Sequence, residues 1–199
     1  MHRRRLESDL DKLTRDRVSG TYTSRMSALT AFDGLPPLRS RSVDQIGIVV
    51  QDLRASLERY AQIWPLGRWN CYVYGPETVN QLTYRGKPAN YSMWIALNTE
   101  SPQIELIQPL TGESLYTEWL AQHGEGLHHL GVYVESLKDS IASITAAGHA
   151  LLQSGYGTGL DGDGGYAYFN TIGDLGMIVE TIEKPSRRRD PQLVWPPAT

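Results

Sequence analysis

The chain has 199 residues, of which 40% are hydrophobic and 21% are charged, and its formal net charge is −3. This length suits one medium domain, or two small modules that share a core, in a globular protein. The charge predicts no broad nucleic-acid-binding surface, which would need a basic patch, and the arginine clusters near the termini are expected to be solvated. No apolar run is long enough for a membrane span, and a single cysteine favours the cytoplasm.

Residues 1–41 are predicted to form an N-terminal arm and a linker. Leu6, Leu10 and Leu13 have helical spacing, which indicates a short amphipathic helix with one narrow apolar stripe. Such a stripe must be buried, and a second subunit would bury it, so we expect a homodimer. The charged N-terminus has no apolar segment of the kind that a secretory signal needs.

From residue 42 the pattern becomes regular and indicates two similar halves. The first half predicts, in order, a strand over 42–50, a helix over 52–64, and strands over 68–75, 90–98 and 102–109. A helix is then predicted over 113–124. The second half predicts a strand over 126–134, a helix over 136–148, and strands over 149–154, 165–170 and 175–183. The remaining residues, 184–199, form a tail without periodicity.

Direct superposition of the two halves supports an internal repeat. Gln45 aligns with His129 at the start of each first strand, and Glu105 aligns with Glu180 inside each last strand. Each half is therefore strand, helix and three strands, which predicts an α+β fold of two modules, 42–110 and 126–183. Because such units are too short to stand alone, we expect them to share one sheet.

Alternation along the strands predicts where these polar side chains point. Gln45 and Gly47 face one way, whereas Ile46 and Ile48 face the following helix, and His129 shares its face with Gly131 and Tyr133. Buried carboxylates are costly unless they are paired or bound to a metal. The predicted metal ligands are Gln45, Glu105, His129 and Glu180. This nitrogen and oxygen set suits an octahedral divalent ion, and Zn²⁺, Co²⁺, Ni²⁺, Mn²⁺ and Fe²⁺ all remain candidates.

Each of these residues alone would be weak evidence. A single glutamate in a strand usually faces solvent, and a single histidine more often fills a core than binds metal. It is the joint occurrence at equivalent repeat positions that favours a site. His128 lacks this support and is predicted to lie on the helix side as a structural or supporting residue. Asp161 and Asp163, in a glycine-rich loop without the spacing of a calcium site, are predicted to be turn residues.

The segments "VDQIGIVVQDL", "IELIQPLTGESLYTEWLAQHGEGLHHLGVYVESL" and "LGMIVETIE" resemble the vicinal oxygen chelate superfamily (glyoxalase, bleomycin resistance and dioxygenase proteins), in particular its methylmalonyl-CoA epimerase-like branch. The resemblance covers residues 42–183. It implies two βαβββ modules that form an eight-stranded, incompletely closed barrel around a metal, with the metal positions at the same four residues. The epimerase pattern usually has histidine at the first position, so Gln45 is instead similar to glyoxalase I of the zinc type.

This resemblance implies an enzyme that acts on a small-molecule carbonyl substrate. The first hypothesis is a metal-dependent isomerase or epimerase that transfers a proton next to the carbonyl, with Glu180 as ligand and base. Tyr133 is a candidate hydrogen-bond donor to the substrate oxygen, with a structural role equally open. Glu77 is the nearby candidate for a second acid or base, although a surface position is favoured for it.

Three other functions remain open to different degrees. A glyoxalase I-type lyase is favoured by the ligand set, but a glutathione-binding set of basic residues is not evident. A ring-cleaving dioxygenase would need two histidines and one carboxylate, and Gln45 replaces one histidine. A non-catalytic small-molecule binding protein of the same fold would lack the metal residues, which this sequence retains.

Overall fold

The computed structural model describes residues 38, 40 and 42–197, so the predicted N-terminal helix lies outside the described residues. The first module contains β1 (Gln45–Val49), α3 (Leu53–Ile63), β2 (Trp69–Tyr74), β5 (Ser92–Asn98) and β6 (Gln103–Thr111). The helix α4 (Leu115–His123) leads to the second module. That module contains β7 (Gly126–Val134), α5 (Leu137–Ala146), β8 (Leu151–Tyr156), β9 (Gly165–Phe169) and β10 (Ile178–Glu183).

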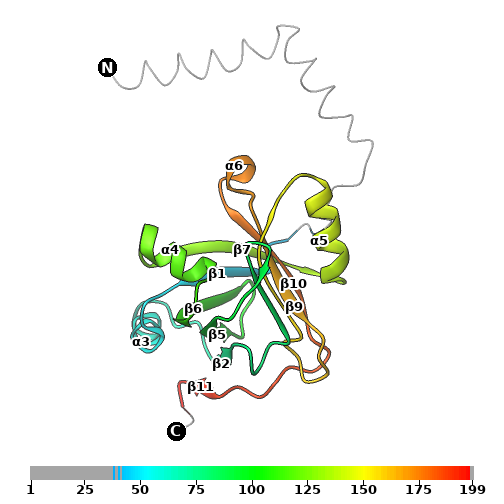
Figure 1. Cartoon of the computed structure of the whole chain (residues 1–199). Coiled ribbons are helices and arrows are strands. Elements are labelled where there is room, and N and C mark those ends of the chain that lie inside the picture. The colour runs from blue at the N-terminus through cyan, green and yellow to red at the C-terminus, as the bar shows by residue number, and fades with distance from the viewer. Residues whose placement is uncertain (1–37, 39, 41, 198–199) are drawn as a thin grey trace, which may run out of the picture. The chain divides into compact units, whose positions relative to one another are not determined.

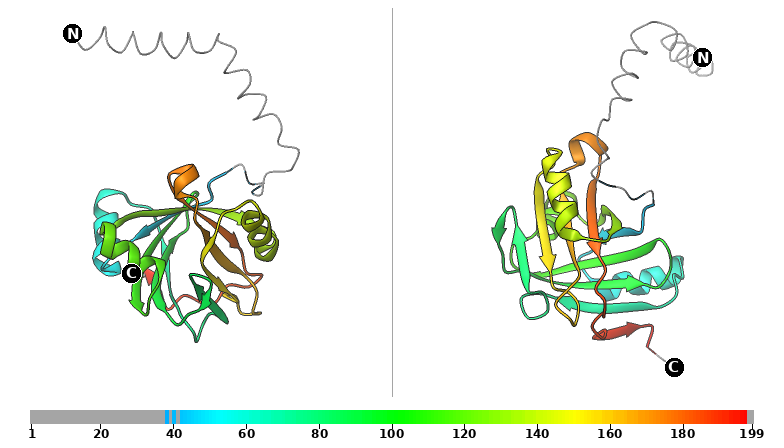
Figure 2. Two further views of the ribbon diagram at one scale, coloured as in Figure 1. Left: turned by 45° about the horizontal axis from the view of Figure 1, so that its top comes forward. Right: turned by 90° about the vertical axis from the view of Figure 1, so that its right-hand side faces the viewer.

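The eight module strands form one curled sheet in the order β2-β5-β6-β1-β7-β10-β9-β8 (Figure 1). In each module the first strand pairs in parallel with the last, β1 with β6 and β7 with β10. The two modules join where β1 and β7 pair antiparallel at the centre. The predicted α+β fold of two βαβββ modules in an incompletely closed barrel is therefore confirmed. Figure 2 shows the sheet curled into an arch, with α3 and α5 on opposite flanks.

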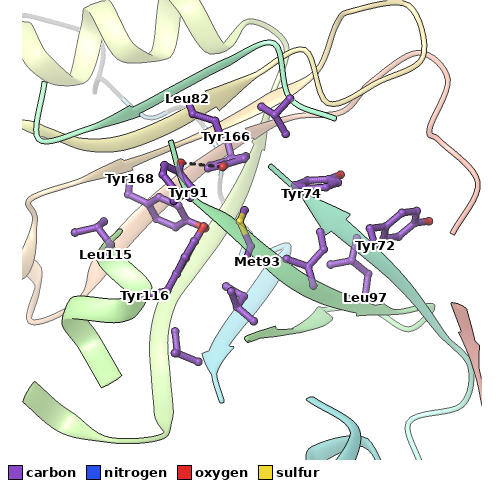
Figure 3. Packing of buried hydrophobic residues seen from close by; sticks show 14 of the residues in the cluster. Tyr72, Tyr74, Leu82, Tyr91, Met93, Leu97, Leu115, Tyr116, Tyr166 and Tyr168 are labelled. Carbon is purple, nitrogen blue, oxygen red and sulfur yellow. Dashed lines mark hydrogen bonds between the residues drawn. The ribbon is translucent and has the colours of Figure 1, made fainter. Parts of the chain in front are cut away.

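Strand alternation divides the core into an outer and an inner part. On the outer side of the first module, Leu53 and Leu57 of α3 pack with Cys71, Ala96 and Leu106. The inner side is rich in tyrosine, and Figure 3 shows these rings gathered with Met93 inside the arch. Hydroxyl pairs satisfy the buried phenols, with Tyr91 and Tyr166 3.0 Å apart and Tyr116 donating to Tyr168 at 3.0 Å. The inner face can therefore hold polar groups within an otherwise apolar core.

Three strands and one short helix were not predicted. A hairpin of β3 (Gln81–Tyr84) and β4 (Lys87–Pro88) occupies the segment read as turns, and β3 pairs with β8 of the other module. In the C-terminal tail, β11 (Leu193–Trp195) pairs with β2. The helix α6 (Ile172–Leu175) is a single turn, too short for its periodicity to be read. In the part of the chain that the structure describes, no helix is long and apolar enough to cross a membrane.

Candidate metal centre

The four predicted ligands lie on the four central strands of the sheet. Gln45 is on β1, Glu105 on β6, His129 on β7 and Glu180 on β10, and all four side chains are buried. They come in pairs from the two modules, which meet at the β1–β7 seam. The structure thus brings together residues that are separated by up to 135 positions in the chain.

Three of these side chains form a tight cluster around the imidazole of His129. Its Nε2 lies 2.9 Å from Oε2 of Glu180 and 3.5 Å from Oε2 of Glu105, and the three ligand atoms lie within 4.8 Å of one another. Within the described residues, these three atoms and Oε1 of Gln45 are buried without a hydrogen-bond partner of good geometry. Buried polar atoms that converge without satisfying one another fit a site for a cation.

Two glycines at equivalent positions of the repeat make room for this cluster. A Cβ atom on Gly47 would lie 1.8 Å from Cε1 of His129, so only glycine allows the imidazole to lie against β1. A Cβ atom on Gly131 would lie 3.0 Å from Cβ of Gln45 and 3.1 Å from Oε2 of Glu180. The same geometry therefore places Gln45 beside Glu180, although these residues come from different modules.

A short chain of amides orients Gln45. Its Nε2 donates to Oε1 of Gln103 at 3.0 Å, and Nε2 of Gln103 donates to the carbonyl oxygen of Asn98 at 3.1 Å. Because the amide nitrogen is held in this way, Oε1 of Gln45 is left as a free acceptor. A carbonyl-type oxygen in this position suits a metal ligand better than a hydrogen-bond donor would.

The predicted position of His128 was wrong. The pairing of β1 with β7 shifts register between Gly47 and Ile48, which leaves His128 as an extra residue in a β-bulge. The bulge turns His128 inward against Tyr168 and against Tyr116 and Trp119 of α4, rather than toward α5, the helix that follows β7. Its Nδ1 then lies 3.0 Å from Nδ1 of His129, so it contacts the candidate ligand directly.

Burial and charge act in opposite directions on the two histidines. Burial alone would lower the pKa of His129, but the carboxylates of Glu180 and Glu105 outweigh it and raise this pKa to about 9. Burial, together with the charge of His129, lowers the pKa of His128 well below its usual value. For Glu105, burial raises the pKa above the usual range of a carboxyl group. The two carboxylates therefore favour the protonated form of His129 when no cation is bound.

A small cavity adjoins the cluster on the inner side of the sheet. Its lining includes Gln45, Glu105, Glu180, Tyr133 and Arg188, and its volume is about 40 Å³. Tyr166 also lines it, whereas Tyr168 packs its ring 4.9 Å from the ring of His129. Tyr133, predicted to face the site, has Nζ of Lys184 3.5 Å from its ring centroid.

The remaining candidates lie away from the cluster. Glu77 is exposed in the loop after β2, as its surface assignment predicted. Asp161 and Asp163 bind the C-terminal segment, through Arg187 and Ser186 respectively. Sequence reasoning missed Gln103 and Asn98, whose role depends on register with β1 and has no signal of its own in the sequence.

The sequence also matches a model of a known protein family. A model of the glyoxalase/bleomycin resistance protein/dioxygenase superfamily matches residues 44–169. The chain belongs to this superfamily. The match includes Gln45, Glu105 and His129 and ends before Glu180, which the structure adds to the cluster. No curated protein sequence matches this superfamily member.

Solved structures share the superfamily fold with this chain at low identity. A hypothetical protein from Bacillus halodurans is 22% identical, with a TM-score of 0.53 over 75% of this chain and 98% of that one. A variant of Streptomyces coelicolor methylmalonyl-CoA epimerase, in complex with 2-nitronate-propionyl-CoA, is 21% identical, with a TM-score of 0.51 over 72% and 97%. Methylmalonyl-CoA epimerase from Mycobacterium tuberculosis is 20% identical, with a TM-score of 0.51 over 74% and 93%. At these identities the likeness shows the fold alone.

Proposed function

We propose that this protein is a metal-dependent isomerase of the epimerase type, which transfers a proton on the carbon next to a substrate carbonyl. The observation that carries the proposal is the buried cluster of Glu105, His129 and Glu180, whose ligand atoms lie within 4.8 Å of one another. Gln45 lines the same cavity, and its Oε1 is buried without a hydrogen-bond partner among the described residues. The likeness in fold to methylmalonyl-CoA epimerases supports the same reaction class.

The proposed ligands supply one nitrogen and three oxygens, which suits an octahedral divalent ion such as Zn²⁺, Co²⁺, Ni²⁺, Mn²⁺ or Fe²⁺. The two carboxylates, Glu105 and Glu180, would neutralise its charge inside the core. Such an ion, when bound, supplies a Lewis acid that stabilises negative charge developing on a carbonyl oxygen.

The chain's own residues would handle the proton. Glu180 is the proposed base, because its carboxylate is buried, lines the cavity and adjoins the space where a carbonyl compound would lie. The hydroxyl of Tyr133, which also lines the cavity, is the proposed hydrogen-bond donor to the substrate oxygen. The apolar, tyrosine-rich surroundings of the site would strengthen both interactions.

Two alternatives share this site. A glyoxalase I-type lyase is favoured by Gln45 as the first ligand, and it would use the same proton transfer on a thiohemiacetal. A small-molecule binding protein of the same fold would need no metal, which the unpartnered cluster argues against.

The first experiment is the metal content of the purified full-length protein beside His129→Ala, with His149→Ala as the matched control. His149 is partly exposed, lies 3.5 Å from Asp174, and is not part of the cluster of candidate ligands. We expect about one divalent ion per chain in the parent and in the control, and a loss of the ion in His129→Ala. A well-folded parent that cannot be loaded with metal would remove both enzyme proposals in favour of the binding protein.

The reaction class is tested by proton exchange in deuterated water. The metal-loaded protein should exchange the α-proton of an acyl thioester, followed by nuclear magnetic resonance, and Glu180→Gln should abolish this exchange. Conversion of the glutathione thiohemiacetal of methylglyoxal, without thioester exchange, would identify the lyase instead. A cytoplasmic location and a homodimer remain predictions, and light scattering of the full chain tests the second.

A further inference from the structure

Residues 184–192 connect β10 of the second module to β11, which pairs with β2 of the first module. Between these strands the segment is hydrogen-bonded to the glycine-rich loop that contains Asp161 and Asp163. The backbone nitrogen of Ser186 donates to Oδ2 of Asp163 at 2.8 Å, and Nε of Arg187 donates to Oδ2 of Asp161 at 2.8 Å. The nitrogen of Leu160 in turn donates to the carbonyl oxygen of Arg187 at 2.9 Å. We call residues 184–192 the strap.

The other side of the strap is also fixed. Nη2 of Arg189 donates to the carbonyl oxygen of Gly159 at 3.4 Å, and Oε1 of Gln192 accepts from the nitrogen of Val73 at 3.2 Å. The chain then continues into β11, which pairs with β2. Arg188 therefore lies between neighbours that are anchored on both sides, and the strap presents it at a defined place.

That place is the mouth of the cavity beside the candidate metal centre. Arg188 lines the cavity together with Glu105, Glu180 and Tyr133, and its guanidinium carbon lies 5.7 Å from the ring centroid of Tyr72. Of the described residues that line this cavity, Arg188 is the only cationic one. Its positive charge also opposes the effect of burial on the pKa of Tyr133 and of Tyr74.

Arg188 differs from its neighbour Arg187, because it has no acidic partner among the described residues. Arg187 is paired with Asp161, and Arg85 is paired with Glu118, whereas no carboxylate of the described residues lies within 4.0 Å of the guanidinium of Arg188. The acids around the cavity have other partners. Glu105 and Glu180 face the candidate metal position, and Oε2 of Glu183 accepts from the nitrogen of Leu137 at 2.7 Å.

We propose that Arg188 binds an anionic group of the substrate, a carboxylate or a phosphate, and so selects carbonyl compounds that carry such a group. This rests on the proposed function, because it names the substrate class of the same site. A guanidinium suits the task, since its planar fork donates two parallel hydrogen bonds to a carboxylate or phosphate. The anchored strap holds this fork in place before the ligand arrives, which reduces the entropy lost on binding.

The test compares two thioesters on the metal-loaded full chain, the methylmalonyl thioester of N-acetylcysteamine and its methyl ester, which lacks the carboxylate. The variants are Arg188→Gln and Arg188→Lys, with Arg54→Gln on α3 as the control, because the exposed side chain of Arg54 pairs with Glu58 and does not line the cavity. We expect Arg188→Gln to lower kcat/KM for α-proton exchange of the carboxylate by about 10- to 100-fold while changing the methyl ester little. Arg188→Lys should lie between, and Arg54→Gln should keep the preference for the carboxylate.

The coenzyme A thioester distinguishes the two sources of the anion. A loss in Arg188→Gln that appears with the coenzyme A thioester but not with the truncated one would assign the phosphate as the ligand. An unchanged ratio between charged and neutral substrates in a folded Arg188→Gln protein overturns the proposal. If the parent exchanges neither thioester, the proposed reaction fails, and the role of Arg188 is then tested by calorimetric binding of the two thioesters. Tighter binding of the carboxylate than of the methyl ester by the parent, lost in Arg188→Gln, would support the role of Arg188. Equal affinity of the parent for the two thioesters would reject it.

Discussion

The imidazole of His129 lies directly against the α-carbon of Gly47, in the space that a side chain on β1 would occupy. These residues are register partners across the seam between the modules. The candidate metal centre therefore depends as much on an absent side chain in one module as on a histidine in the other.

Replacement of Gly47 by alanine tests this dependence. The new Cβ atom would lie 1.8 Å from Cε1 and 2.2 Å from Nε2 of His129, so the imidazole must leave its position. We expect a loss of metal binding and a decrease of about 1–3 kcal/mol in the free energy of unfolding, as for overpacked cores. Gly173→Ala in α6 is the control, because its Cβ would meet nothing within 4 Å. Urea unfolding and metal titration of both variants check the prediction, which fails if they bind metal equally.

His128 is expected to position His129. For Nε2 of His129 to be a free ligand, its Nδ1 must carry the proton and donate to Nδ1 of His128, and the lowered pKa keeps His128 neutral as the acceptor. His128→Phe removes this acceptor and should lower metal affinity by about 10- to 100-fold. His128→Asn can still accept and should lose less. Equal affinities of the two variants, measured by competition with a chelating dye, would assign His128 to packing alone.

Metal affinity should depend on pH. The pKa of His129 is raised to about 9 in the metal-free protein, so a metal ion must displace a proton from it below that pH. We expect the apparent affinity to rise about tenfold per pH unit from pH 7 to 9 and then to level off. Titrations across this range check the slope, and a flat profile would show that His129 is not a ligand.

The metal-free protein should show the opposite trend in stability. Because the pKa of His129 is raised on folding, the stability from its protonation is fully present below pH 6.5 and is lost as the pH rises through about 9. Urea unfolding in the presence of a chelator should therefore show lower stability at pH 9 than at pH 6.5. His129→Ala should flatten this difference, and an unchanged pH dependence in that variant would exclude His129 as its source.

The strap should become accessible when its anchors are removed. Asp161→Asn removes the ion pair with Arg187, and Asp163→Asn weakens the bonds to Ser186. We expect trypsin to cut the arginine cluster 187–189 several-fold faster in these variants, while the sheet remains resistant. Asp139→Asn on the exposed start of α5 is the control, and equal cleavage of all three proteins would show that the two aspartates do not hold the strap.

Much of the fold could be predicted because the two halves of the sequence share polar residues, as well as apolar ones, at equivalent positions. Gln45 with His129, and Glu105 with Glu180, identified both the modules and the strands that meet at the centre. Alternation then assigned the two faces of β1 correctly, since Gln45 lines the cavity while Ile46 and Ile48 pack in the outer core.

What could not be predicted depends on register and on distant pairing. The bulge at His128 reverses the face of one residue, and alternation assumes that no such bulge exists. The hairpin of β3 and β4 forms against a strand of the other module, so its sequence alone reads as turns. The strap carries Arg188 to the cavity through contacts with a glycine-rich loop, and these have no periodic signal.

The terminal strands of the sheet, β11 and β4, limit how a second copy of this protein could pair with it. β8 and β2 would each leave a row of unpaired backbone groups, and these are covered by β3 with β4 at one end and by β11 at the other. The covering strands are short, with three residues in β11 and two in β4, one of them Pro88. Such strands offer little backbone for a second chain to extend. Growth of the sheet from copy to copy is therefore disfavoured at both ends, and the predicted homodimer would have to form through side chains on the faces of the sheet and its helices.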